Sequence, residues 1–260
     1  MPEAVASKKL SWKWIVVGIV VGVFLTVSLY LAMGKTFSTG TVPTYMSLLG
    51  FIVMGIIIGY KSAGYTLTEP AIGGIFTAML AGFFLSNVME IEFSPTDKIV
   101  APVLGLILGF IGGWVGEELQ VTPEEKAKEL AEEAAGKKLQ WGWIAAGTIL
   151  AFILNAFFVF GGFALLKFGL GGIFMSLGAS FLLAGLLTAY YSPGRTIWEA
   201  ALAGVFSMIL NFVFLYIGFD RTILPIGYII GMMIGGFVLS LLGGYFGEKL
   251  QSYMEDRIDP

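Results

Sequence analysis

Eight long apolar stretches dominate this sequence and restrict what it can fold into. They lie at roughly 12–33, 44–60, 67–89, 99–116, 141–165, 170–191, 196–217 and 222–246. Each approaches or exceeds the ~20 residues that an α-helix needs to cross ~30 Å of hydrocarbon. Because 57% of the 260 residues are hydrophobic and only 13% are charged, the composition excludes a soluble globular domain. We therefore predict eight transmembrane helices.

The sequence also repeats itself. KKLSWKWI at 8–15 matches KKLQWGWI at 137–144, and GGWVGEELQ at 112–120 matches GGYFGEKLQ at 243–251. Between these pairs, YKSAGYTLTE at 60–69 and YYSPGRTIWE at 190–199 share the pattern Y-x-S-x-G-x-T-x-x-E. The three offsets are 129, 131 and 130 residues, so the start, end and middle of two halves align. This regularity predicts a tandem duplication.

The fold that follows is an all-α integral membrane protein made of two tandem parallel four-helix repeats. An even number of spans returns the chain to its starting side, which makes the repeats parallel. We expect repeats at 1–120 and 137–260, joined by a charged cytoplasmic linker at 121–136. The linker begins with Thr122, Pro123 and Glu125, the pattern of a helix start, and predicts a short surface helix. It is either a solvated connector or a docking site for a partner.

The basic residues predict the orientation of the chain. Eleven of the 15 Lys and Arg residues lie at the termini, in the linker and in the two Y-x-S-x-G-x-T-x-x-E connections, which are all on one predicted side. The other predicted side holds only Lys35, Lys98, Lys167 and Arg221. Since short cytoplasmic loops carry an excess of Lys and Arg, both termini should be cytoplasmic. We expect a protein integral to the cytoplasmic (inner) membrane.

Composition also limits the chemistry. The sequence has no His and no Cys, which excludes Ser-His-Asp triads, Cys nucleophiles and thiolate metal sites, and we expect no cofactor or metal. A net charge of -3 without a dense basic patch excludes a nucleic-acid partner. On the side opposite the termini, the acids Glu90, Glu92, Asp97 and Asp220 lie in short loops without a nucleophile and base nearby. We predict that the protein is not an enzyme.

The duplicated motif has two interpretations. Gly64 and Gly194 follow an apolar span, where a left-handed residue commonly ends a helix. The T-x-x-E spacing that follows is typical of a capping box at the start of the next helix, with Glu69 and Glu199 in its water-accessible first turn. Alternatively, Glu69 and Glu199 form a symmetric pair that binds a cation or relays protons.

The deep polar residues of the spans are neutral. Thr26 and Asn155 are separated by 129 residues and therefore occupy matching positions near the middle of the first span of each half. Polar side chains at this depth commonly hydrogen-bond to a neighbouring helix. The alternative is a polar spot that binds a solute.

Small residues recur on one face of the last span of each half. The matching positions are Gly105, Gly109 and Gly113 in the first half, and Gly236, Ser240 and Gly244 in the second. Such small-xxx-small faces let membrane helices approach closely. We expect both spans to be packing helices that contact each other across a pseudo-twofold axis; a glycine-lined pore or hinge is the alternative.

Two functions remain compatible with these features. The first is a non-catalytic multi-pass protein, a scaffold or accessory subunit of a membrane assembly. The second is a permease or channel for a small neutral or apolar solute between the two repeats, an association that rests only on the parallel repeat. The partners we expect are membrane lipids and either another membrane protein or further copies of this chain.

Overall fold

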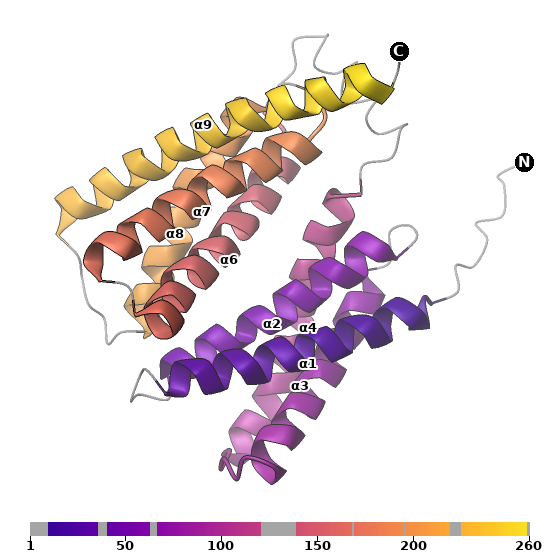
Figure 1. The fold of residues 1–260 in the computed structure, drawn as a ribbon. Coiled ribbons are helices and arrows are strands. Elements are labelled where there is room, and N and C mark those ends of the chain that lie inside the picture. Colours follow the sequence, from indigo (N-terminus) through magenta and orange to yellow (C-terminus); the bar gives the residue numbers. More distant parts are fainter. Residues whose placement is uncertain are drawn as a thin grey trace, which may run out of the picture. The chain divides into compact units, whose positions relative to one another are not determined.

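The computed structural model describes residues 10–35, 41–62, 67–120, 139–167, 169–194, 196–218 and 225–258. All regular secondary structure in these ranges is helical, with no strand among them. The helices, shown in Figure 1, are α1 (Trp12–Gly34), α2 (Thr41–Lys61), α3 (Thr68–Asn87), α4 (Pro95–Glu118), α6 (Trp141–Leu166), α7 (Leu170–Tyr191), α8 (Ile197–Gly218) and α9 (Ile226–Ile258).

Eight described helices are each long and apolar enough to cross a bilayer, which confirms the predicted spans. Their outward surfaces are apolar as well. Phe24 on α1, Phe83 on α3 and Met175 on α7 are more than half exposed, at 69%, 64% and 77%. Lipid tails are as apolar as these side chains, so such surfaces are stable in a membrane.

The helix ends differ from the predicted spans mainly at α4 and α9. Helix α9 continues past the predicted end at 246 to Ile258. Its 33 residues correspond to a length of ~50 Å, well beyond the ~30 Å of hydrocarbon. Hydropathy marks the part of a helix that lies in lipid, whereas a helix can continue into water because its backbone bonds are internal.

Helix α4 begins earlier than predicted because a capping box starts it. The backbone N–H of Asp97 donates to the Ser94 hydroxyl at 3.2 Å, and the backbone N–H of Ser94 donates to the Asp97 carboxylate at 3.1 Å. Pro95 occupies the first helical position, where its missing N–H costs nothing. These reciprocal bonds satisfy two donors that a helix start leaves unpaired.

The chain divides into two compact units. One comprises Met1–Leu29 with Ser47–Glu117, and the other comprises Tyr30–Met46 with Glu118–Pro260. The predicted linker at 121–136, with its predicted surface helix, lies outside the described residues.

In the second unit, α9 packs against α7 and α8, and α6 packs against the same two helices. Glycines allow this close approach. A Cβ atom added to Gly243 or Gly247 would overlap the carbonyl oxygen of Leu182 or Leu186 on α7. A Cβ atom on Gly204 of α8 would lie 2.5 Å from the carbonyl oxygen of Gly236. The backbones of α7, α8 and α9 are therefore in direct contact.

The first unit is packed in the same way. A Cβ atom added to Gly112 or Gly116 on α4 would overlap the carbonyl oxygen of Ile52 or Ile56 on α2. Gly105 on α4 faces the backbone of Gly74 on α3. Helix α4 thus contacts α2 and α3 through glycines, as α9 contacts α7 and α8.

The small-residue faces are filled within their own units. A Cβ atom on Gly109 would lie 2.5 Å from the Pro70 carbonyl oxygen, and one on Gly113 would overlap the Pro70 ring. In the second unit, the Ser240 hydroxyl donates to the Phe181 carbonyl at 3.3 Å, and a Cβ atom on Gly244 would lie 3.0 Å from the Ala200 side chain. Each of these faces is therefore packed against helices of its own unit. A contact between the two faces across a pseudo-twofold axis stays a prediction.

Candidate functional site

Glu69, the acid of the first repeated motif, is buried at the start of α3 with an exposed fraction of 1%. Its carboxylate accepts a hydrogen bond from the backbone N–H of Ser11 at 2.6 Å and another from the Ser62 hydroxyl. Ser11 is the residue that starts α1, because its carbonyl accepts from the N–H groups of Trp14 and Ile15. Glu69 thus caps the N-terminus of α1 from a different helix.

Glu199, the acid of the second motif, has the same role in the other unit. It is the third residue of α8, is 6% exposed, and accepts a hydrogen bond from the backbone N–H of Gln140 at 3.1 Å. Gln140 is the N-cap residue of α6, and its side-chain amide donates to the Pro193 carbonyl at 3.2 Å. The start of α6 is therefore joined both to the first turn of α8 and to the connection between α7 and α8.

These contacts correct the interpretation of the motif. The two acids are buried, although we expected them in water-accessible turns. Each satisfies the N–H of a helix start, as predicted, but of the first helix in its half rather than of its own helix. Helix α3 begins after its N-cap residue Leu67, which makes no side-chain capping bond. Gly64 and Thr66 lie outside the described residues, so their predicted roles stay predictions.

The second motif has further internal bonds. The hydroxyls of Thr196 and Ser192 hydrogen-bond to each other, and the Thr196 carbonyl accepts from the Ala200 N–H at 3.0 Å. Gly194 has φ 81°, in the left-handed region that favours glycine, which agrees with its predicted role after α7. The motif thus ends one helix, starts the next and supplies the cap of a third.

A carboxylate is well suited to this position. A helix N-terminus leaves four backbone N–H groups without partners, and carries a partial positive charge. An acid that accepts one of these N–H groups satisfies a donor and interacts favourably with the helix dipole. Glu69 therefore joins α3 to the start of α1 and to Ser62 after α2, and Glu199 joins α8 to the start of α6.

A third acid, Glu248 in the second half, was not anticipated as a helix cap. Glu248 on α9 accepts the backbone N–H of Ile197, the first residue of α8, at 3.1 Å. Three residues on, the Gln251 side-chain amide donates to the Ser192 carbonyl at 3.4 Å. The signal was present in the sequence, because Glu248 belongs to the repeated G-G-x-x-G-E-x-L-Q, where Glu117 is its counterpart.

Thr26 and Asn155 are both buried, at 4% and 1% exposure. Asn155 on α6 accepts a hydrogen bond from the Ser180 hydroxyl on α7 through its side-chain oxygen. Thr26 on α1 lies against Gly50 of α2, the position that corresponds to Ser180. Among the described residues, neither the Asn155 amide nitrogen nor the Thr26 hydroxyl finds a hydrogen-bond partner.

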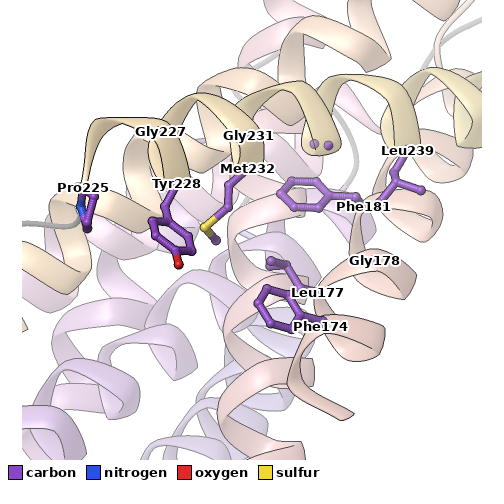
Figure 2. Close-up of a pocket in the computed structure, with 12 residues that line it drawn as sticks. Phe174, Leu177, Gly178, Phe181, Pro225, Gly227, Tyr228, Gly231, Met232 and Leu239 are labelled. Carbon is purple, nitrogen blue, oxygen red and sulfur yellow. The ribbon is translucent and has the colours of Figure 1, made fainter. Parts of the chain in front are cut away.

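An apolar groove of about 600 Å³ lies between the N-terminal halves of α7 and α9 (Figure 2). The polar side-chain groups in its lining are the hydroxyl of Tyr228 and the weakly polar sulfur of Met232, and its other side chains are apolar. The groove is lined by Phe174, Leu177, Gly178 and Phe181 on α7, by Pro225, and by Gly227, Tyr228, Gly231, Met232, Gly235, Gly236 and Leu239 on α9. The sequence pattern does not predict this groove.

Comparison with known proteins adds no further assignment. No protein-family model matches the chain, and searches of curated proteins and of solved structures gave no match. The class of protein therefore follows from the described helices. Eight apolar helices of membrane-spanning length make the chain a multi-pass membrane protein.

Proposed function

We propose that this protein is a non-catalytic scaffold or accessory subunit of a membrane assembly, built from two tandem parallel four-helix repeats. The observation that carries the proposal is the equivalent use of Glu69 and Glu199. Each is buried and accepts the N–H of the residue that starts the first helix of its half. The most conspicuous charged residues of the spans serve to hold helices together.

The contacts of the glycines support the same repeat and the same function. Gly112 meets Ile52 and Gly243 meets Leu182, and each member of the first pair matches one of the second at an offset of 131 or 130. Where these backbone contacts occur, they leave no room between the helices for a solute path. A rigid, closely packed four-helix frame suits a protein that presents surfaces to partners.

The orientation belongs to the proposal as well. With both termini and the 121–136 linker in the cytoplasm, the charged residues of the linker are available to a cytoplasmic or membrane partner. The basic residues support this orientation through the positive-inside rule.

A permease or channel for a small neutral or apolar solute is the second candidate. The observation that favours it is the pair of unpartnered polar groups, the Thr26 hydroxyl and the Asn155 amide nitrogen, at matching buried positions. Buried polar groups without partners are uncommon and often mark a binding site or bound water.

Purification and flux measurements separate the two candidates. For a scaffold, extraction from native membranes in mild detergent should retain a stoichiometric membrane-protein partner, identified by mass spectrometry. The purified protein alone in liposomes should not increase glycerol entry, followed by light scattering, above that of empty liposomes. Glycerol entry that depends on the protein and falls in an Asn155→Leu variant would overturn the scaffold in favour of the permease.

A further inference from the structure

The groove between α7 and α9 is closed at one end and open at the other. Toward the C-terminal half of α9, the backbones of the two helices meet where Gly243 faces Leu182 and Gly247 faces Leu186. Toward the N-terminal ends of both helices they separate, and the groove occupies the space from Pro225 to Leu239. The groove therefore has the form of a wedge that narrows into the protein.

Glycines on α9 create this space. A Cβ atom added to Gly227, Gly231 or Gly235 would meet nothing within 4 Å, in contrast to the tightly packed Gly243. Their spacing of four residues places them in a row along the helix. Part of the α9 wall of the groove is therefore a strip of bare backbone.

The first half of the sequence carries large side chains at the matching positions. Val100 and Leu104 correspond to Gly231 and Gly235 at the offset of 131, and Leu48 corresponds to Gly178 at the offset of 130. The groove therefore depends on residues in which the two halves differ. A feature required only for the shared helix packing would need no such difference.

Length and depth restrict what can fill the groove. From Ile226 to Leu239 the helix rises ~20 Å, somewhat more than the ~15 Å depth of one leaflet. A transmembrane helix from a partner needs ~20 residues and must pass through both leaflets. It cannot continue past the point where Gly243 and Leu182 close the groove. A single hydrocarbon chain, which lies within one leaflet, meets no such obstruction.

The lining agrees with a hydrocarbon chain. Figure 2 shows Tyr228 and Met232 of α9 facing the same space as Phe174, Leu177 and Phe181 of α7. A buried water needs two to four polar partners, which these side chains do not supply. The volume of about 600 Å³ is within the ~300–1,000 Å³ range of small-molecule sites. Tyr228, in the first turn of α9, places its hydroxyl near the headgroup level.

From this geometry we propose that the groove is a specific binding site for one acyl chain of a membrane phospholipid, from the leaflet in which α7 and α9 begin. The chain lies against Gly227, Gly231 and Gly235, and its headgroup remains outside near Tyr228. This site goes beyond the proposed function and does not depend on it.

Photo-crosslinking of the full chain tests the site. The protein is placed in phosphatidylcholine nanodiscs that contain increasing fractions of a phosphatidylcholine with a diazirine on one acyl chain. After illumination, labelled residues are mapped by mass spectrometry. At every fraction of probe, labelling at Phe174 and Met232 should exceed labelling at Phe24, because a chain held in the groove stays beside these two residues. Labelling at Phe24, a lipid-exposed residue on α1, should rise in proportion to the probe.

Filled-groove variants supply the decisive comparison. The double variant Gly231→Leu and Gly235→Leu places its new side chains in open space, so it should fold. Its labelling at Phe174 should fall to the level of labelling at Phe24. Gly161→Leu on α6, which also points into open space, should leave groove labelling unchanged. If the double variant does not fold, Gly178→Leu fills the groove from α7, where the added Cβ meets only Leu239 at 3.6 Å.

Two results would overturn the proposal. Labelling at Phe174 that does not exceed labelling at Phe24, and that filling does not reduce, means that only bulk lipid touches the groove. A dimer measured by light scattering, lost in the Gly231→Leu and Gly235→Leu variant, means that a second copy of the chain occupies it instead.

Discussion

The two motif acids, Glu69 and Glu199, occupy sites where a buried carboxylate is matched by donors. Glu69 receives a backbone N–H and a hydroxyl, and Glu199 receives a backbone N–H. An isolated buried charge is costly, but hydrogen bonds to the charged form and a helix N-terminus reduce that cost. As helix caps, these residues would require only an acceptor oxygen, whereas a cation site would require the negative charge itself.

We therefore predict that Glu69→Gln is tolerated and that Glu69→Ala is destabilising. Glutamine keeps an oxygen that accepts the Ser11 N–H, whereas alanine removes that acceptor. Leaving a buried donor unsatisfied costs about 1–3 kcal/mol. Thermal unfolding in detergent measures the difference, with Glu92→Ala, at an exposed position between α3 and α4, as the control. Equal damage from Gln and Ala would show that the carboxylate charge is required.

A second prediction concerns Asn155, whose counterpart in the first half is Thr26. Asn155→Thr removes the unpartnered amide, and a threonine hydroxyl in a helix can bond to a carbonyl of the preceding turn. Ser180 keeps its bond to the Leu177 carbonyl at 2.7 Å. The free energy of unfolding of the variant should lie within about 1 kcal/mol of that of the parent protein, as it does for other volume-conserving changes. A much larger loss of stability would indicate that the amide has a partner or ligand.

At the level of helices, glycine has opposite roles at different positions on α6 and α9. At Gly243 a side chain would overlap the Leu182 carbonyl, whereas at Gly161 it would meet nothing within 4 Å. In a helix interior without contacts, alanine is favoured over glycine by about 0.5–1 kcal/mol because the unfolded chain loses less entropy on folding. Alanine substitutions at these two positions therefore distinguish the effect of helix propensity from the effect of helix packing.

We predict that Gly243→Ala and Gly161→Ala change stability in opposite directions. Gly243→Ala forces α7 and α9 apart and loses dispersion contacts along their interface, so its unfolding temperature in detergent should fall. Gly161→Ala should raise it slightly or leave it unchanged. Gly112→Ala on α4, where the glycine faces Ile52, should lower the unfolding temperature in the same way as Gly243→Ala. If Gly243→Ala is as stable as Gly161→Ala, backbone contact does not hold these helices together.

The sequence predicts the helices better than it predicts their contacts. Hydropathy locates α7 at 170–191 because each residue in lipid contributes locally to the pattern. The bond from Ser11 to Glu69 links residues 58 positions apart, so its partner cannot be inferred from T-x-x-E spacing. The groove likewise depends on where α7 and α9 separate. The repeated G-G-x-x-G-E-x-L-Q does mark Glu248, but not which helix it caps.

For the whole molecule, the predicted parallel repeat and the predicted orientation depend on each other. Four spans in each half place the termini and the 121–136 linker on the same side. The predicted excess of Lys and Arg on that side makes it the cytoplasmic one. If either number of spans were odd, the basic residues would no longer gather on one side, so topology tests both expectations at once.

We predict opposite labelling of two introduced cysteines. Because the chain has no Cys, a membrane-impermeant maleimide reports a single position without background. Ser252→Cys, exposed near the end of α9, should react only from the cytoplasmic side. Glu92→Cys, exposed between α3 and α4, should react only from the opposite side, because five described helices separate the two positions. Lys167→Cys, after α6, is the matched control and should follow Glu92→Cys, since α4 and α6 lie between them. Labelling of Glu92→Cys and Ser252→Cys from the same side would contradict the eight-span topology, whereas a complete exchange of sides would keep the topology and reverse the orientation.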